Sequence, residues 1–188
     1  MTRSSHELCL ADFSAADILG LFDRADEIAG GAPPLINRTS PAPGPSEPEL
    51  TAESWQVLQA LHRLRRDGQA LEELTVAWVG AATADLHAWL EAASILGITL
   101  RMAVPDGYEP DAGLFLACEG RAPGRLVRCR DEAAARAGAT LVLTPALPTE
   151  PASPPIDAGD LAAALTEFLA ARARGRVDFR ALLNSIHE

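Results

Sequence analysis

A short loop between two apolar segments holds the residues of this chain that are best placed to bind a small molecule. Residues 80–85 read GAATAD and follow the β-branched run of residues 74–79. A helical pattern starts directly after them, so the loop joins the carboxyl end of a strand to the first turn of a helix. Open α/β sheets bind ligands at such places, and the N–H groups of a helix N-terminus attract carboxylates. Thr83 and Asp85 are therefore candidate ligand-binding residues, with an ordinary strand–helix connection as the alternative.

His87 is a third candidate, because it lies one turn into the same predicted helix. Its apolar neighbours Leu86 and Trp89 favour a packed, hydrogen-bonded histidine over a catalytic one. The remaining histidines have no serine or cysteine partner in any recognisable motif, and the chain has no G-x-S-x-G elbow. We therefore predict no catalytic residue.

Cofactor chemistry finds no support in the sequence. The loop has only the first glycine of the G-x-G-x-x-G fingerprint, so we reject NAD. All 16 basic residues are arginine, which excludes a Schiff-base lysine, a pyridoxal phosphate attachment and a phosphate-loop lysine. The three cysteines, Cys9, Cys118 and Cys129, lack C-x-x-C spacing. We expect free, mostly buried thiols in a reducing cytoplasm, no metal site and no cofactor.

The composition limits the partners as well. A net charge of −10 argues against nucleic acid and against an anionic membrane surface. No apolar run approaches the length of a membrane span, and the first residues lack the apolar core of a secretory signal. We therefore expect a cytoplasmic protein whose 188 residues, 48% of them hydrophobic, form one ordinary core with appendages.

Strands alternate with helices through the middle of the chain, which predicts an open parallel sheet. We expect a single Rossmann-like sheet of about four strands flanked by helices. The expected strands are residues 74–79, 99–104, 125–129 and 141–144; the expected helices follow residue 80 and cover 51–67, 113–118 and 131–137.

A helix and a linker precede this region. Ser14 can cap a helix over residues 14–29, with Asp17 placed to bond back to the cap. Residues 32–50 hold six prolines and predict a linker without an element. The resulting organisation is an N-terminal helix (1–31), a linker (32–50) and an α/β domain with a helical tail (51–188).

The tail predicts two amphipathic helices after a proline-rich passage at residues 145–155. The first covers residues 160–173, and we expect its apolar face to pack on the sheet, with a dimer surface as the alternative. The second begins at Asp178. The face of the first comprises Leu161, Leu165, Phe168 and Leu169.

The stretch from residue 74 to 111 resembles the second, amino-acid-binding domain of ornithine carbamoyltransferases, whose text runs roughly WVGDGNN…H…AA…G…R.ATP.GYEP. The N-terminal helix and the PLIN segment at residues 34–37 also resemble that family. The resemblance covers about 20 residues near the start and about 110 from Pro34 to Thr144. The residues that match this family sequence are Trp78, Val79, Gly80, His87, Ala92, Ala93, Gly97, Arg101, Pro105, Gly107, Tyr108, Glu109 and Pro110.

The departures from the family lie at its functional positions. The family's H-P-x-Q motif aligns with Glu53-Ser54-Trp55-Gln56, so Gln56 alone matches a carbamoyl-contacting residue. The last Asn of G-D-G-N-N aligns with Ala84, and the Asp expected to pair with the substrate ammonium aligns with Pro145. The S-T-R-T-R loop that holds carbamoyl phosphate and the H-C-L-P loop find no match.

Three functional hypotheses follow from this resemblance. The first is a degenerate, non-catalytic relative that acts as an amino-acid-binding or protein-partner module. Its candidate ligand residues are Gln56, Thr83, Asp85 and His87. The second is a carbamoyltransferase that is active only with a completing partner subunit, and the third is a purely structural interaction protein. Each is compatible with a homo-oligomer or a hetero-partner.

Overall fold

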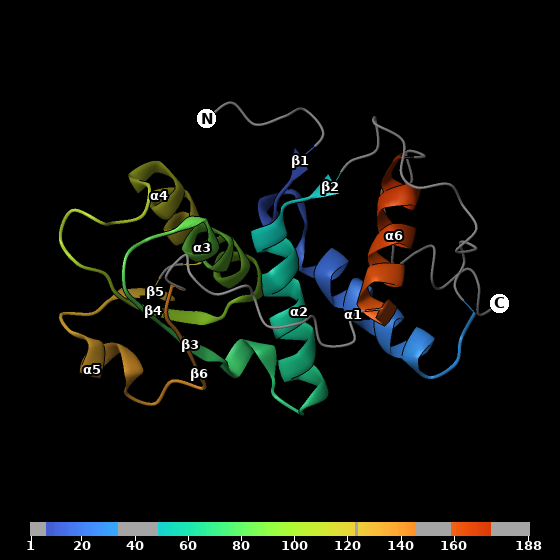
Figure 1. The fold of residues 1–188 in the computed structure, drawn as a ribbon, viewed down its shortest axis with the longest axis horizontal. Coiled ribbons are helices and arrows are strands. Elements are labelled where there is room, and N and C mark those ends of the chain that lie inside the picture. The colour runs from blue at the N-terminus through green and yellow to red at the C-terminus, as the bar shows by residue number, and fades with distance from the viewer. Residues whose placement is uncertain (1–6, 34–48, 123, 146–158, 174–188) are drawn as a thin grey trace. The chain divides into compact units, whose positions relative to one another are not determined.

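The structure is a computed structural model that describes residues 7–33, 49–122, 124–145 and 159–173 (Figure 1). The chain divides into two compact units. The α/β unit comprises Cys9–Ala11 and Ala52–Pro151, and the helical unit comprises Met1–Leu8, Asp12–Thr51 and Ala152–Glu188. No helix in the described ranges is long and apolar enough to cross a membrane.

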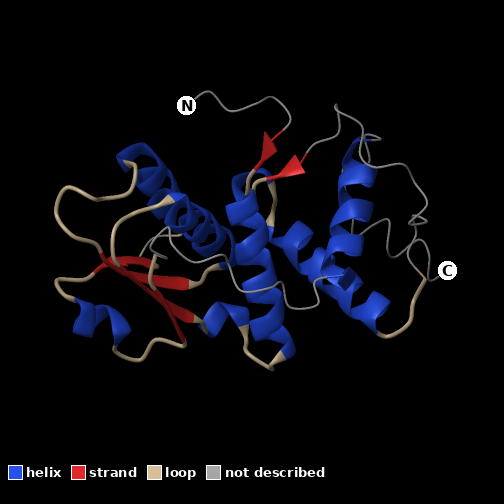
Figure 2. Ribbon diagram, in the orientation of Figure 1, coloured by secondary structure: helices blue, strands red, loops and turns tan. Residues whose placement is uncertain are grey.

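A four-stranded parallel sheet forms the centre of the α/β unit, drawn in red in Figure 2. Its order is β5-β4-β3-β6, so the two longest strands are central and the short ones form the edges. Every neighbouring pair is parallel, which confirms the predicted Rossmann-like class. The strands are β3 (Thr75–Val79), β4 (Thr99–Ala103), β5 (Leu126–Arg128) and β6 (Leu141–Leu143).

The strand register divides the sheet into two faces. Val76, Leu100 and Leu126 lie side by side on one face, and all three are buried. Ala77 and its neighbour Arg101 lie on the other face, where successive side chains alternate. There, small side chains form a compact cluster beneath a short helix: Ala77, Val79, Ala103 and Ala135.

Four α-helices surround this sheet. Helix α3 (Ala84–Leu96) contacts β4 and β5, and α2 (Ala52–Arg66) and α4 (Ala112–Arg121) both pack on α3. Helix α5 (Glu132–Arg136) contacts β3 and β4. A 3₁₀ turn at Leu71–Glu73 leads into β3. Each predicted strand and helix of this region is confirmed, with ends shifted by up to three residues; the helix expected over 113–118 runs from Ala112 to Arg121.

The helical unit pairs α1 (Ala15–Ala29) with α6 (Gly159–Ala173). Ser14 and Asp17 form the predicted capping box, in which each side chain bonds the other's backbone N–H. The predicted packing of the α6 apolar face on the sheet is wrong, because the helix packs on α1. Phe168 of α6 also stacks on Phe13, two residues before α1, with ring centroids 5.1 Å apart. A helix–helix pair buries the same stripe that a sheet would bury.

Short elements were not predicted from the sequence. β1 (Glu7–Leu8) pairs in parallel with β2 (Glu49–Leu50), and a 3₁₀ turn covers Leu10–Asp12. β2 corrects the expectation that residues 32–50 form no element, while residues 34–48 lie outside the described ranges. The second tail helix, expected from residue 178, also lies outside them.

Candidate functional site

The loop after β3 is held in place by hydrogen bonds on several sides. The Trp78 indole Nε1–H donates to the carbonyls of Gly80 and Ala81, each at 3.2 Å. The Gly80 N–H donates to the Ala103 carbonyl at 3.0 Å, at the end of β4. The Ala82 N–H donates to the Tyr108 carbonyl at 2.9 Å. The loop therefore forms a fixed edge at the carboxyl end of the sheet, as predicted for a ligand-binding position.

Gly80 also makes a close approach to the end of β6. Its φ is +130°, and a Cβ added there would lie 2.7 Å and 2.8 Å from the Cδ and Cγ of Pro145. Only glycine fits both the backbone angle and the space. The Pro145 ring therefore lies directly against the loop. At this position the family resemblance implies a substrate-binding carboxylate.

The first turn of α3 gathers Thr83 and Asp85. Thr83 is the N-cap, but its side chain makes no capping hydrogen bond; its Oγ1 donates instead to Asp85 Oδ2 at a long 3.4 Å. The N–H groups of the first three helical residues have no acceptor inside the helix, because the i−4 partner is missing. This end thus offers N–H donors for a carboxylate and, at Asp85, an acceptor for a cation. Such a pair of groups suits a zwitterion.

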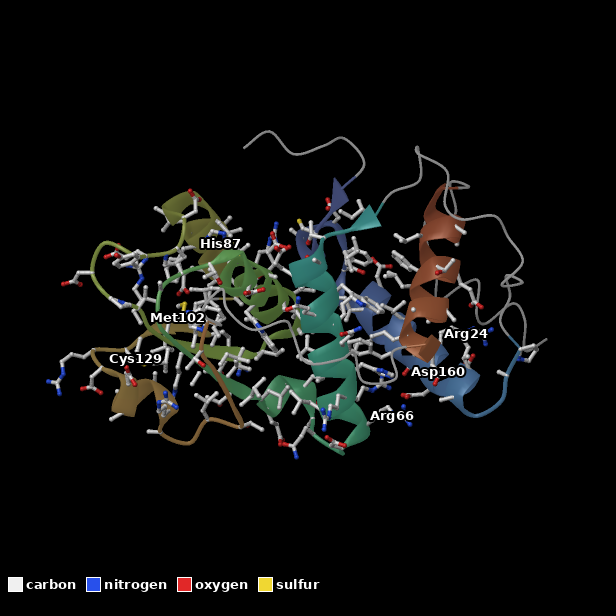
Figure 3. All side chains as sticks on the ribbon, viewed as in Figure 1. Arg24, Arg66, His87, Met102, Cys129 and Asp160 are labelled. Atoms are coloured by element: carbon white, nitrogen blue, oxygen red, sulfur yellow. The ribbon has the colours of Figure 1, made fainter. Side chains whose placement is uncertain are left out.

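His87, labelled in Figure 3, serves a different contact. Its Nε2 accepts a hydrogen bond from the Asp111 backbone N–H at 3.3 Å. A nitrogen that accepts carries no proton, so the ring proton lies on Nδ1. Asp111 is the N-cap of α4 and accepts from the Leu114 N–H. His87 therefore ties α3 to the start of α4, which matches the hydrogen-bonded histidine expected from the sequence.

Gln56 stands apart from the other three candidates. It is exposed on α2, and within the described residues no hydrogen bond joins its amide to Thr83, Asp85 or His87. The structure thus brings Thr83, Asp85 and His87 together on one helix end. The Gln56 assignment depends on the resemblance alone.

The loop whose Tyr108 carbonyl accepts the Ala82 hydrogen bond also contains a carboxyl group with a shifted pKa. Backbone N–H groups of Glu109 and Gly107 lower the pKa of the exposed Glu109 carboxyl, and the charge of Arg128 acts in the same direction. Sequence reasoning missed the parts that Trp78, Tyr108 and Pro145 play here. The sequence Gly107-Tyr108-Glu109-Pro110 identified this loop as a motif. The hydrogen bond that its Tyr108 carbonyl accepts could not be predicted, because it depends on the fold.

Two other chemistries find no support in the described residues. Burial raises the pKa of the Cys118 thiol, and the charge of Glu91 raises it further, against a hydrogen bond from Ser94 and the charge of Arg121. A thiol of raised pKa is a poor nucleophile at neutral pH. Among the described residues, no group of three or more His, Cys, Asp and Glu side chains could hold a metal ion.

Comparison with known proteins gives a partial similarity. No family model matches the chain, and no solved structure matches it. Ornithine carbamoyltransferase of Pelobacter propionicus is 42% identical over 71 residues, which is 38% of this chain and 23% of that protein. The protein of the same name from Thermus thermophilus is 43% identical over 64 residues, or 34% of this chain and 21% of that protein.

A third relative matches over a longer part of the chain. Ornithine carbamoyltransferase of Halorhodospira halophila is 34% identical over 124 residues, or 65% of this chain and 37% of that protein. The chain therefore spans only 21% to 37% of the length of these curated relatives. Over that part, and in agreement with its parallel α/β sheet, this chain is ornithine-carbamoyltransferase-like.

Proposed function

We propose that this chain is an ornithine-carbamoyltransferase-like binding module that holds a small amino-acid-like ligand and does not itself transfer a carbamoyl group. The observation that carries the proposal is the end of α3, where unpaired N–H groups and the Thr83–Asp85 pair lie together at the carboxyl edge of the sheet. A ligand carboxylate accepts from the N–H groups, and a ligand ammonium donates to Asp85. The net charge and the cysteine pattern favour a cytoplasmic location for this module.

The contacts around Pro145 and His87 support the absence of transfer. Carbamoyl transfer requires several donors that converge on the developing charge. The Pro145 ring lies against Gly80, where the resemblance implies a carboxylate, and the His87 Nε2 already accepts from Asp111. The Pro145 ring therefore offers neither a donor nor a base, and the Nε2 lone pair of His87 is already engaged by Asp111.

Ligand binding is tested by melting temperature and calorimetry. A ligand that binds only the folded state raises the melting temperature. We expect an α,δ-diamino acid to raise it, and its decarboxylated diamine to raise it less, because the diamine lacks the group that meets the helix end. Asp85→Asn should weaken the response, whereas Glu72→Gln, at an exposed carboxylate on the turn before β3, should leave it unchanged.

A second candidate is a carbamoyltransferase that needs a completing subunit. It is favoured by the name of the relatives, ornithine carbamoyltransferase. Mixing the chain with carbamoyl phosphate and a diamino acid, with and without a full-length relative, distinguishes the two. Turnover by the chain alone refutes the non-catalytic proposal, and turnover that needs the mixture supports the second candidate.

A purely structural role is the third outcome of the same experiments. It predicts that neither an amino acid nor carbamoyl phosphate changes the melting temperature. Such a result would leave the α3 end as an ordinary strand–helix connection and would refute the binding proposal.

A further inference from the structure

Glu91 is a buried carboxylate in the middle of helix α3, with 9% of the residue exposed. The buried charges Arg24 and Glu167 pair with each other, whereas Glu91 has no ion pair with any residue of the described ranges. Its carboxylate accepts one hydrogen bond there, from the Ala11 backbone N–H to Oε2 at 3.2 Å. A buried charge with so few partners costs free energy, so packing alone does not account for this side chain.

The donor of that bond has no acceptor in its own segment. Ala11 is the second residue of the 3₁₀ turn Leu10–Asp12, and the first N–H groups of a helix have no partner inside it. Glu91 supplies the missing acceptor from 80 positions further along the chain. Negative charge also suits the start of a helical turn. Glu91 therefore holds this turn against α3.

Residues Cys9–Ala11 form a short strap on the α/β unit. They belong to that unit, whereas the residues on both sides of them belong to the helical unit. Within the helical unit the neighbours of the strap are fixed. The Leu8 carbonyl accepts from the Thr51 N–H at 2.9 Å, and Phe13 stacks on Phe168. Only the few residues between these fixed points have to move for the strap to leave α3.

Two contributions of opposite sign act on the strap. Leu10 is fully buried, and its burial stabilises the attached state. The bond to Glu91, at 3.2 Å, is longer than the roughly 2.7–2.9 Å of a strong charge-assisted hydrogen bond. Release of the strap also lets water reach the Glu91 carboxylate, which recovers part of the cost of burying it. The released state therefore lies closer in free energy to the attached state than the unfolded chain does.

We infer that the strap Cys9–Ala11 detaches from α3 locally, without unfolding of the sheet, and that Glu91 is the residue that holds it in place. Local opening is typical of short segments that few buried contacts retain. Glu91 acts here as a positioning residue, because its carboxylate touches only the Ala11 backbone. The inference does not depend on ligand binding at α3.

Hydrogen exchange of the full chain over a urea series tests the local opening. Exchange through unfolding becomes faster with urea in proportion to the surface exposed. The Ala11 amide should exchange faster than the Leu100 amide, which is bonded to the Arg125 carbonyl at the edge of β4. Its rate should hardly change at low urea, because release of the strap exposes little surface. An Ala11 amide that follows Leu100 at every urea concentration, or that is not protected at all, overturns the inference.

Substitution of Glu91 tests its role in holding the strap. Glu91→Met should accelerate exchange at the Ala11 amide at least about tenfold, because a hydrogen bond to a charged acceptor is lost. Glu91→Gln keeps an acceptor oxygen and should recover most of the protection. Glu119→Met is the matched control, because the Glu119 carboxylate also accepts from a backbone N–H, that of Gly124 at 3.1 Å. It should leave Ala11 exchange unchanged.

Circular dichroism and melting curves establish that the three variants fold. Ala11 exchange that Glu91→Met leaves unchanged, or that Glu91→Gln accelerates as much as Glu91→Met does, overturns the role assigned to Glu91. Acceleration of Ala11 exchange by Glu119→Met would show that the opening is not confined to the strap, and this result overturns the inference as well.

Discussion

Arg24 and Glu167 are separated by 143 positions in the chain, yet their side chains form a buried ion pair in the helical unit. Arg24 Nε donates to Glu167 Oε2 at 2.9 Å, with 6% and 2% of the two side chains exposed. Arg24 Nη1 also donates to Glu27, and Nη2 to the Pro33 carbonyl, each at 2.8 Å. Burial opposes the charge, but the bonds to Glu167 and Glu27 outweigh it and raise the pKa of Arg24.

Breaking this pair should destabilise the helical unit strongly. Arg24→Met or Glu167→Met alone should lower the free energy of unfolding by about 3–5 kcal/mol, because each removes one member of a buried ion pair. The double variant should be close to wild type, since it removes both charges. Urea unfolding followed by circular dichroism measures all three. Arg136→Met, in the exposed pair with Glu132 at 3.6 Å, is the control and should change stability by less than about 1 kcal/mol. Additive losses in the double variant would contradict the argument.

Gly80→Ala should destabilise the α/β unit by about 2–4 kcal/mol, because it combines a strained φ with a clash against Pro145. Pro145→Ala in the same chain should recover only part of the loss, since the φ of +130° remains. Gly120→Ala is the matched control, because its Cβ meets open space and alanine favours a helix. A Gly80→Ala protein as stable as wild type would show that the loop relaxes away from Pro145.

His87→Ala should lower the free energy of unfolding by about 1 kcal/mol through the loss of one hydrogen bond between α3 and the start of α4. The specific signature is hydrogen exchange at the Asp111 amide, which should become faster because its acceptor is gone. The Leu114 amide, bonded to Asp111 Oδ1 at 2.8 Å, reports whether the α4 cap itself stays intact. Unchanged exchange at Asp111 would contradict the assigned contact.

Glu109 should give the α/β unit a pH-dependent stability. Its pKa is lowered in the folded state by backbone N–H groups. The contribution is therefore fully present above the carboxyl's unfolded-state pKa and is lost as pH falls through the folded-state pKa. The free energies of unfolding of wild type and Glu109→Gln should therefore converge as the pH falls through this acidic range. A carboxyl NMR titration should place Glu109 below its ordinary value, and a titration at or above that value would contradict the backbone contacts.

The sequence predicts elements well where local signals agree. The run of residues 74–79 and the glycines at 80 and 97 mark β3 and the ends of the α3 segment, because strand and helix periods differ and glycine takes a positive φ. The capping box at Ser14 is likewise a local pattern. β1 and β2 escape prediction because two residues are too few to show a period.

Long-range contacts could not be read from the sequence in the same way. Nothing near Arg24 indicates Glu167 as its partner, and an amphipathic stripe on α6 fits a helix or a sheet equally well. At the candidate site, Thr83 and Asp85 were found because helix position alone brings them together. The Pro145 contact with Gly80 depends on β6 pairing beside β3, which only the sheet order reveals.

The pairing of α1 with α6 has a consequence for synthesis on the ribosome. The partner of α1 lies 130 residues further along, from Ala29 to Gly159. At an elongation rate of roughly 5–20 residues per second, on the order of ten seconds pass between the synthesis of α1 and that of α6. The segments of the α/β unit are complete before that moment, so it can fold first while the apolar stripe of α1 remains uncovered. During this interval α1 lacks the helix that packs on it in the folded chain, and its apolar stripe is open to chaperones and to misplaced contacts.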